Sequence, residues 1–394
     1  MDNNKNLFAS NAFKFVIILG IVSLFSDMTY EGGGAVNGQY LGLLGASALA
    51  ISIAAGLGEF LGYALRSVSG YVADKSGKYW LLTFIGYGFN LFAVPAMAIA
   101  GKWQIAVLLI LLERTGRAIR KPTIDAMLSY TTNSIGRGWA YALHTALDEI
   151  GATIGPLIAA LVLFLHGSYQ AVYAWLLVSA ILALGSLTFA RITFPVPARL
   201  EEGKTATETK FTRSYWLYTM AGAFFAAGIM SYELISFHFA IRHIVAYQWI
   251  PLLLAFSTGS GVLANLALGR LYDRSALKTV IISVIISSLF APLVFAGGWP
   301  ALILAMIVWG ISYAVQDTLL KAIVAGVLPE GKRNLAFGLF YVFYGSGWLI
   351  GSVVMGLLYS RSLPLLIAFT VAMQLISLPL FFVARQMQNQ SQNN

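Results

Sequence analysis

Residues 13–35 read FKFVIILGIVSLFSDMTYEGGGA, a mainly apolar stretch in which only Lys14, Asp27 and Glu31 are charged. A helix rises about 1.5 Å per residue, so this stretch is long enough to cross a hydrocarbon core of about 30 Å. Similar runs recur as far as Val383 and, with short loops, fill the chain. The sequence therefore predicts an all-α polytopic membrane protein with twelve transmembrane helices.

The composition excludes an ordinary soluble domain. Hydrophobic residues make up 58% and charged residues 10% of the 394 residues, against about 45–50% and 25% in soluble domains. The chain has no cysteine, which excludes disulfides and thiolate metal sites. Residues 1–11 are polar and carry no cleavable-signal pattern, so we expect the first span to remain in the mature protein.

The net charge of +9 reflects membrane topology rather than a nucleic-acid partner. If the N-terminus is cytoplasmic, most lysines and arginines fall in cytoplasmic segments, and the outside loops keep only Lys102, Arg242 and Arg361. This asymmetry is the positive-inside signal. It predicts a multi-pass protein of the plasma membrane, surrounded by lipid, with both termini in the cytoplasm.

The chain divides into two halves at one long polar segment. We predict spans at residues 13–35, 46–72, 79–99, 103–127, 138–164, 171–191, 215–240, 248–271, 278–296, 300–326, 334–359 and 363–384. Residues 195–214 are rich in charge and have little to bury. The expected organisation is an N-terminal six-helix bundle over 1–194, a cytoplasmic linker over 195–214 and a C-terminal six-helix bundle over 215–394.

The two halves match each other at fixed offsets, which indicates an internal duplication. At an offset of 196, five residues of span five fall on identical residues of span eleven: Arg137, Ala140, Leu143, Gly151 and Gly155 on Arg333, Ala336, Leu339, Gly347 and Gly351. At an offset of 199, a loop triplet matches a later one: Gly70, Asp74 and Lys75 on Gly269, Asp273 and Arg274. The predicted bundles are therefore pseudo-symmetric.

The segment between spans two and three contains Gly70, Asp74, Lys75, Gly77 and Lys78. It resembles the loop signature G-x-x-x-D-R/K-x-G-R/K of the major facilitator superfamily, and the twelve-span plan extends the resemblance over the whole chain. The resemblance implies a conformational latch. We expect Gly70 to allow close helix approach and Gly77 a tight turn. The copy containing Gly269, Asp273 and Arg274 has Ala276 in place of the second glycine, so we expect a weaker latch there.

Span five contains Gly151, Gly155 and Pro156, a helix-packing motif that resembles part of the G-x-x-x-G-P signature of antiporters in this superfamily. Ala159 and Ala160 stand where that signature has further glycines. Small residues four apart are also ordinary packing between membrane helices. The motif thus favours an antiporter, and packing alone is the alternative.

Charged and titratable residues inside spans mark the candidate site, because a charge at a helix centre costs about 2.5–3.5 kcal/mol on insertion scales. The candidates for proton coupling or the substrate cavity are Asp27, Glu31, Glu59, Glu113, Arg114, His144, Asp148, Glu149 and Glu233. Asp27, Glu59 and Asp148 are expected at similar depths and could line one cavity. Glu233 is expected near the outer mouth, either functional or simply solvated.

The basic residues Arg117, Arg120 and Lys121 end the fourth span. They loosely resemble a basic fourth-span motif of the same superfamily, but a position at the cytoplasmic interface explains them as ordinary inside charge. Arg114 lies about 16 Å from the outer end of the span at 1.5 Å per residue. We therefore expect it to need a partner, and Glu113 is the nearest.

These features together favour a secondary transporter that works by alternating access around a midplane site. Burial favours the neutral form of a carboxyl group, so Asp148, Asp27 and Glu59 are the candidates to carry a proton, tuned by the Glu113 and Arg114 pair. The leading hypothesis is proton-coupled export of a small, cationic or amphipathic molecule. The alternatives are uptake of an organic anion with Arg114 as counter-ion, and export of a divalent metal through Asp27, His144 and Asp148.

An enzyme or a receptor is not expected. The sequence contains no H-E-x-x-H, G-x-S-x-G or phosphate-binding glycine loop, and no appended effector domain. We expect no cofactor and no resident metal, and the functional unit is expected to be a monomer.

Overall fold

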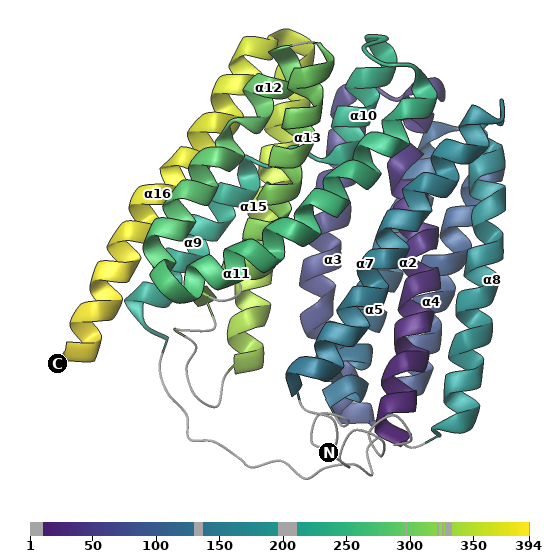
Figure 1. Ribbon diagram of the computed structural model, residues 1–394, viewed down its shortest axis with the longest axis horizontal. Helices are drawn as coiled ribbons and strands as arrows, with labels where there is room; N and C mark the ends of the chain where they lie inside the picture. Colours follow the sequence, from purple (N-terminus) through teal and green to yellow (C-terminus); the bar gives the residue numbers. More distant parts are fainter. Residues whose placement is uncertain are drawn as a thin grey trace, which may run out of the picture. The chain divides into compact units, whose positions relative to one another are not determined.

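The computed structural model describes residues 11–129, 137–195, 211–296, 298–320, 323–324, 327 and 333–393. Within these ranges the regular structure is entirely helical (Figure 1). Most of the polar segment predicted as a linker, the loop after span four and the loop before span eleven lie outside the described residues.

The helices of the first half agree with the predicted spans to within a few residues, apart from longer ends. They are α2 (Asn11–Leu43), α3 (Ala48–Ser76), α4 (Tyr79–Ala96) with η1 (Met97–Ile99), α5 (Trp103–Ser129), α7 (Arg137–Phe164) and α8 (Tyr169–Thr193). Three of them contain a proline: Pro95 in α4, Pro122 in α5 and Pro156 in α7.

The second half contains α9 (Arg213–Ala227), α10 (Tyr232–Ile241), η3 (Tyr247–Trp249), α11 (Ile250–Ser288), α12 (Phe290–Ala296), α13 (Trp299–Ala314), η4 (Val315–Leu320), α15 (Arg333–Arg361) and α16 (Leu363–Asn393). The seventh span is interrupted between α9 and α10, and Gln374 of α16 donates a hydrogen bond of 3.0 Å to the buried carbonyl of Gly228. α11 comprises two spans joined across Ser275, whose φ of −159° and ψ of 72° are not helical.

Ten helices of the described chain are long and apolar enough to cross a membrane. α5 is long enough but carries charged residues along its second half, and α13 is apolar but has only 16 residues before η4 continues it. With α5 and α13 included, the helices account for the twelve predicted spans. The prediction of an all-α membrane protein is confirmed.

The chain packs as two compact units. The first consists of Met1–Val36 and Leu65–Lys204, and the second of Asn37–Ala64 and Thr205–Asn394. Each has its own apolar core: Phe15, Leu19 and Tyr87 are fully buried in the first, and Phe225, Phe340 and Trp348 in the second. The end of α2 and the beginning of α3 pack within the second unit. The two predicted six-helix domains stay a prediction.

The glycines of the predicted packing motif lie where two helix backbones touch. A Cβ atom added at Gly151 would lie 2.2 Å from the backbone oxygen of Leu24, and one at Gly155 would lie 2.5 Å from that of Met28. Any side chain would force α7 away from α2. Pro156 follows directly, inside the same helix.

The second unit repeats this contact with different helices. Cβ atoms added at Gly347 and Gly351 of α15 would each lie 2.2 Å from a backbone oxygen of α9, that of Ala223 and that of Ala227 respectively. The residues that match by sequence thus play the same structural role in both halves, as a duplicated chain requires.

Candidate functional site

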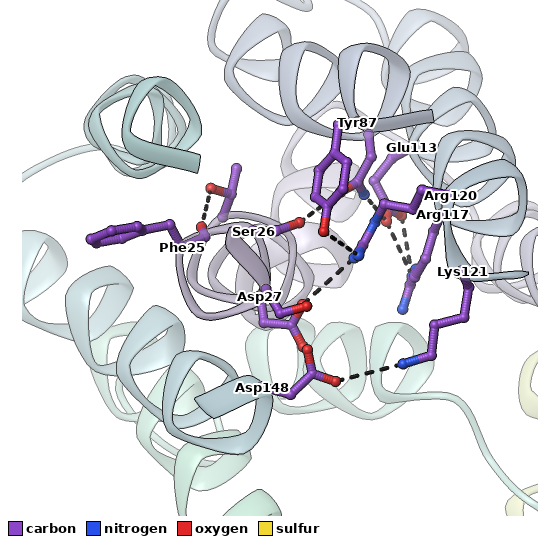
Figure 2. A network of polar contacts seen from close by, with 12 residues as sticks. Phe25, Ser26, Asp27, Tyr87, Glu113, Arg117, Arg120, Lys121 and Asp148 are labelled. Atoms are coloured by element: carbon purple, nitrogen blue, oxygen red, sulfur yellow. Dashed lines mark hydrogen bonds and ion pairs between the residues drawn. The ribbon is translucent and has the colours of Figure 1, made fainter. Parts of the chain in front are cut away.

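Polar side chains of α2, α4, α5 and α7 form a buried cluster in the first unit (Figure 2), and Arg120 of α5 is its most buried charged side chain. Only 4% of the Arg120 side chain and 5% of the Asp27 side chain are exposed, and their nearest nitrogen and oxygen lie 3.6 Å apart. Arg120 also donates a hydrogen bond of 3.2 Å to the Tyr87 hydroxyl and lies 4.6 Å from the centre of that ring. α2, α4 and α5 therefore meet at one guanidinium group.

Close backbone contact between α4 and α5 explains how Arg120 reaches this position. A Cβ atom added at Gly116 would lie 2.5 Å from the backbone oxygen of Gly86, and one at Gly86 would lie 2.7 Å from the backbone nitrogen of Arg120. Because both residues are glycine, the helix axes can approach closely. The residues beside this contact, Tyr87 and Arg120, are thereby brought into hydrogen-bonding distance.

Glu113 lies one helical turn before Arg117 on α5 and connects three helices. Its carboxylate lies 3.2 Å from Arg117 and 3.5 Å from Arg114. It also accepts a hydrogen bond of 2.8 Å from Asn90 of α4, whose oxygen accepts one of 3.1 Å from Ser26 of α2. The predicted pairing of Glu113 with Arg114 is confirmed as a contact.

Asp148 of α7 forms the more accessible side of the cluster. Its carboxylate lies 3.7 Å from the Lys121 ammonium, and these side chains are 22% and 35% exposed. On its other side the carboxyl group of Asp148 faces that of Asp27 (Figure 2). Two neighbouring carboxylates repel each other, and a proton bound to either one relieves that repulsion. The two acids thus form a neighbouring pair flanked by two cations, Arg120 and Lys121.

Two further side chains enclose the cluster. His144, one turn before Asp148 on α7, is 3% exposed and its Nε2 lies 3.0 Å from the Ser23 hydroxyl of α2. The ring of Tyr30 lies 4.2 Å from the Arg117 guanidinium and 5.7 Å from that of Arg120, within range of cation–π attraction. α2 therefore presents Ser23, Asp27 and Tyr30 to the same cluster from one face.

The structure brings together five of the nine residues predicted for the cavity: Asp27, Glu113, Arg114, His144 and Asp148. Glu31 and Glu149 are half-buried on α2 and α7. Glu59 and Glu233 belong to the second unit, so a cavity shared by Glu59 and Asp27 stays a prediction. Glu233 is 6% exposed, which excludes its interpretation as a solvated residue.

The interpretation of Arg120 as an ordinary charge at the membrane interface is wrong. The guanidinium is buried and paired, and Arg117 and Lys121 are also paired with carboxylates. The spacing of Glu113, Arg117 and Arg120, four and three residues apart, was a readable sign of one charged helix face. Tyr87 and Asn90 were missed altogether, because a single polar residue in an apolar span says nothing about its partner.

The predicted metal route has no support in the geometry. The described residues contain no group of three or more histidine, aspartate or glutamate side chains placed to hold a metal ion. Asp27, His144 and Asp148 instead contact Arg120, Ser23 and Lys121.

The predicted latch loop is described in part. Gly77 has a φ of +64°, as expected for a tight turn that favours glycine, and Lys75 and Lys78 are exposed. The prediction that Gly70 allows close helix approach is wrong. An added Cβ atom would lie 3.5 Å from the Pro122 side chain, an ordinary van der Waals distance. The side chains of Asp74 and Asp273 lie outside the described part.

The later copy of the loop turns differently. Gly269 lies within α11, and Arg274 is exposed just before the non-helical Ser275. Because the chain turns there with a negative φ, Ala276 meets no conformational penalty.

Comparison with known proteins defines the class. The model of the Major Facilitator Superfamily matches residues 8–277 and 245–394. The chain therefore belongs to the Major Facilitator Superfamily, a family of membrane transporters rather than of enzymes.

Relatives and solved structures agree with this assignment. The chain is 32% identical over 385 residues to an uncharacterized protein of Mycobacterium tuberculosis, covering 96% of this chain and 94% of the relative. It is 26% identical over 378 residues to an uncharacterized MFS-type transporter of Methanocaldococcus jannaschii, covering 91% and 92%. Its fold resembles that of a peptide transporter POT in complex with sulfate, with a TM-score of 0.75, 13% identity and coverage of 96% and 94%. Its fold also resembles that of a mutant of the nucleoside transporter NupG, with a TM-score of 0.72 and 16% identity. That match covers 94% of this chain and 99% of the NupG chain.

Proposed function

We propose that this transporter exports a small molecule in exchange for protons, by alternating access in the plasma membrane, with both termini in the cytoplasm. The observation that supports it is the neighbouring carboxyl pair of Asp27 and Asp148, which is flanked by Arg120 and Lys121. Such a pair is a proton site with two fixed cations beside it.

Proton occupancy of this pair changes how the helices are held. When the proton leaves, both carboxylates are charged, and each attracts its own cation more strongly: Asp27 attracts Arg120 and Asp148 attracts Lys121. When the proton binds, at least one of these contacts weakens. Since the two ion pairs join α2 and α7 to α5, protonation favours a different packing of these helices. This dependence of conformation on a bound proton is what coupled transport requires.

The other candidate residues have supporting roles in this proposal. Glu113, with Arg114 and Arg117, anchors α5 to Asn90. His144 holds α7 to Ser23. Glu31, Glu59, Glu149 and Glu233 are proposed as further polar groups of the transport route, and the loop from Gly70 to Lys78 as a latch.

One observation favours a second candidate, uptake of an organic anion together with protons. The contact between Lys121 and Asp148 is the most exposed ion pair of the cluster and is 3.7 Å long. When Asp148 is protonated, Lys121 is available to an anionic cargo. Arg114, the counter-ion expected from the sequence, instead lies beside Glu113.

The sign of proton movement distinguishes the two candidates. Small organic cations and anions are added to the purified transporter in weakly buffered detergent, and the pH change is recorded. Export by antiport predicts proton release on binding of a cation, whereas uptake by symport predicts proton uptake on binding of an anion. Asp148→Asn should abolish the signal and leave binding intact, because an amide cannot exchange a proton.

Asp125→Asn, which changes an aspartate of α5 outside the carboxyl pair, serves as the matched control and should keep the signal. Undiminished proton release from Asp148→Asn would transfer the coupling role away from this residue.

A further inference from the structure

In the second unit, one buried tyrosine packs against two other aromatic rings and contacts a buried amide. Tyr63 of α3 is 6% exposed, and its ring stacks on that of Tyr341 with a centroid distance of 5.4 Å and an interplanar angle of 11°. The ring of Tyr344 meets it edge-on at 5.5 Å and 78°. Tyr341 and Tyr344 both belong to α15. Trp348 follows Tyr344 by four residues in the same helix. We call Gln316, Tyr341, Tyr344 and Trp348 the aromatic seat.

The hydroxyl of Tyr63 is recognised by a buried amide. Gln316 is 8% exposed, its Nε2 donates a hydrogen bond to the Tyr63 hydroxyl, and its Oε1 accepts one of 2.9 Å from Tyr344. A buried amide among apolar side chains is costly unless it is hydrogen-bonded. Gln316 therefore depends on an oxygen-bearing partner at the position that Tyr63 now fills.

The backbone at Gln316 is also unusual. It lies in η4, a π-helical turn that follows α13. π-Helical turns are rare, and many occur at functional sites, where they redirect side chains out of the regular α-helical register. Here the turn carries the amide that contacts both Tyr63 and Tyr344.

Trp348 provides a donor that is not used in this conformation. It is 0% exposed, and its Nε1 has no hydrogen-bond partner among the residues that the structure describes. The indole lies against Tyr344 at 6.0 Å between ring centres. A buried N–H without an acceptor loses free energy relative to its solvated state, and phenylalanine would fill the same apolar space without that loss.

We infer that the aromatic seat binds the cargo, a planar aromatic molecule with a phenol-like hydroxyl and a second oxygen acceptor, and that Tyr63 occupies the seat when cargo is absent. The ring of the cargo stacks on Tyr341, its hydroxyl takes the place of the Tyr63 hydroxyl at Gln316, and its acceptor oxygen binds Trp348. This inference rests on the proposed transport function and names the cargo class for it.

The test measures binding of 7-hydroxycoumarin, a fluorescent planar phenol with a carbonyl oxygen, by anisotropy with the purified protein in detergent. Tyr63→Ala should bind it at least about tenfold more tightly than the unmodified protein, because an occupied seat lowers the apparent affinity by the fraction of molecules in which it is free. Tyr63→Phe keeps the ring and loses the bond to Gln316, so its affinity should fall between the two. This milder variant carries the test if Tyr63→Ala does not fold.

Recognition of the two oxygens is tested separately in the Tyr63→Ala protein. Coumarin, which lacks the hydroxyl, should compete about tenfold less well than 7-hydroxycoumarin, the ratio for one hydrogen bond of about 1.4 kcal/mol. Gln316→Leu should remove this discrimination, and Trp348→Phe should weaken both compounds alike. Equal affinity of the folded Tyr63 variants and the unmodified protein, or discrimination that survives Gln316→Leu, would overturn the inference.

Proton coupling is tested independently of this site. Asp148→Asn should bind 7-hydroxycoumarin as the unmodified protein does. If binding follows the expected order while no ligand causes proton movement, the proposed coupling fails and the aromatic seat stands.

Discussion

At the scale of single residues, Arg120 is the group on which the polar cluster of the first unit depends. It contacts Asp27 and Tyr87 and is almost completely enclosed. A buried ion pair that loses one partner leaves an uncompensated charge, which costs about 3–5 kcal/mol. A buried pair that loses both charges together costs far less.

Arg120→Gln should therefore lower the unfolding free energy by about 3 kcal/mol or more, because Asp27 is left without its cation. Asp27→Asn introduced into the same chain should restore most of the loss. Thermal unfolding in detergent measures both effects. Arg361→Gln, which removes an exposed arginine, is the control and should stay within about 0.5 kcal/mol. No recovery in the double variant would mean that Arg120 acts by packing rather than by charge.

At the scale of helices, glycines decide which elements touch. Gly155 contacts α2 through the backbone of Met28, and Gly351 contacts α9 through that of Ala227. The consequence reaches the site, since α7 carries both His144 and Asp148 towards α2.

Gly155→Ala should destabilise the protein by about 1–3 kcal/mol, the usual cost of overpacking. It should also weaken proton release, because it separates Asp148 from Asp27. Gly185→Ala is the matched control: no atom lies within 4 Å of the added Cβ, and alanine favours a helix over glycine by about 0.5–1 kcal/mol. A Gly155→Ala protein as stable as the Gly185→Ala protein would contradict the backbone contact.

The loop between α3 and α4 is the second element with a testable role. Asp74→Asn should slow transport and leave the thermal midpoint unchanged, because a latch contact exists in only one state of the cycle. Transport by inverted vesicles, normalised to folded protein, measures the effect. If Asp74→Asn transports as fast as the unmodified protein, the loop between α3 and α4 is not a latch.

At the scale of the whole molecule, the distribution of basic residues predicts the orientation in the membrane. The exposed Lys75, Lys78 and Arg274 flank the two matching turns, at Gly77 and at Ser275. The positive-inside rule places both turns in the cytoplasm.

The chain contains no cysteine, so single cysteines report topology without background. Ser76→Cys and Ala276→Cys should react with an impermeant maleimide only in inverted vesicles. Lys102→Cys, in a predicted outside loop, should react only in right-side-out vesicles. Labelling of either turn from the outside would reverse the orientation.

The sequence alone determined the fold class, because span length and apolar content follow directly from the thickness of the bilayer. It also identified Asp27, Glu113, His144 and Asp148, since a polar side chain in an apolar span is visible without knowing its neighbours. Only the tertiary structure showed that Arg120, Tyr87 and Asn90 complete the cluster and that Gln316, Tyr341 and Tyr344 surround Tyr63. Which residues meet depends on the rotation and spacing of packed helices. Backbone contacts such as that between Gly86 and Gly116 set this geometry. The residues that they bring together are far apart in the sequence, and no sequence pattern predicts that they pair.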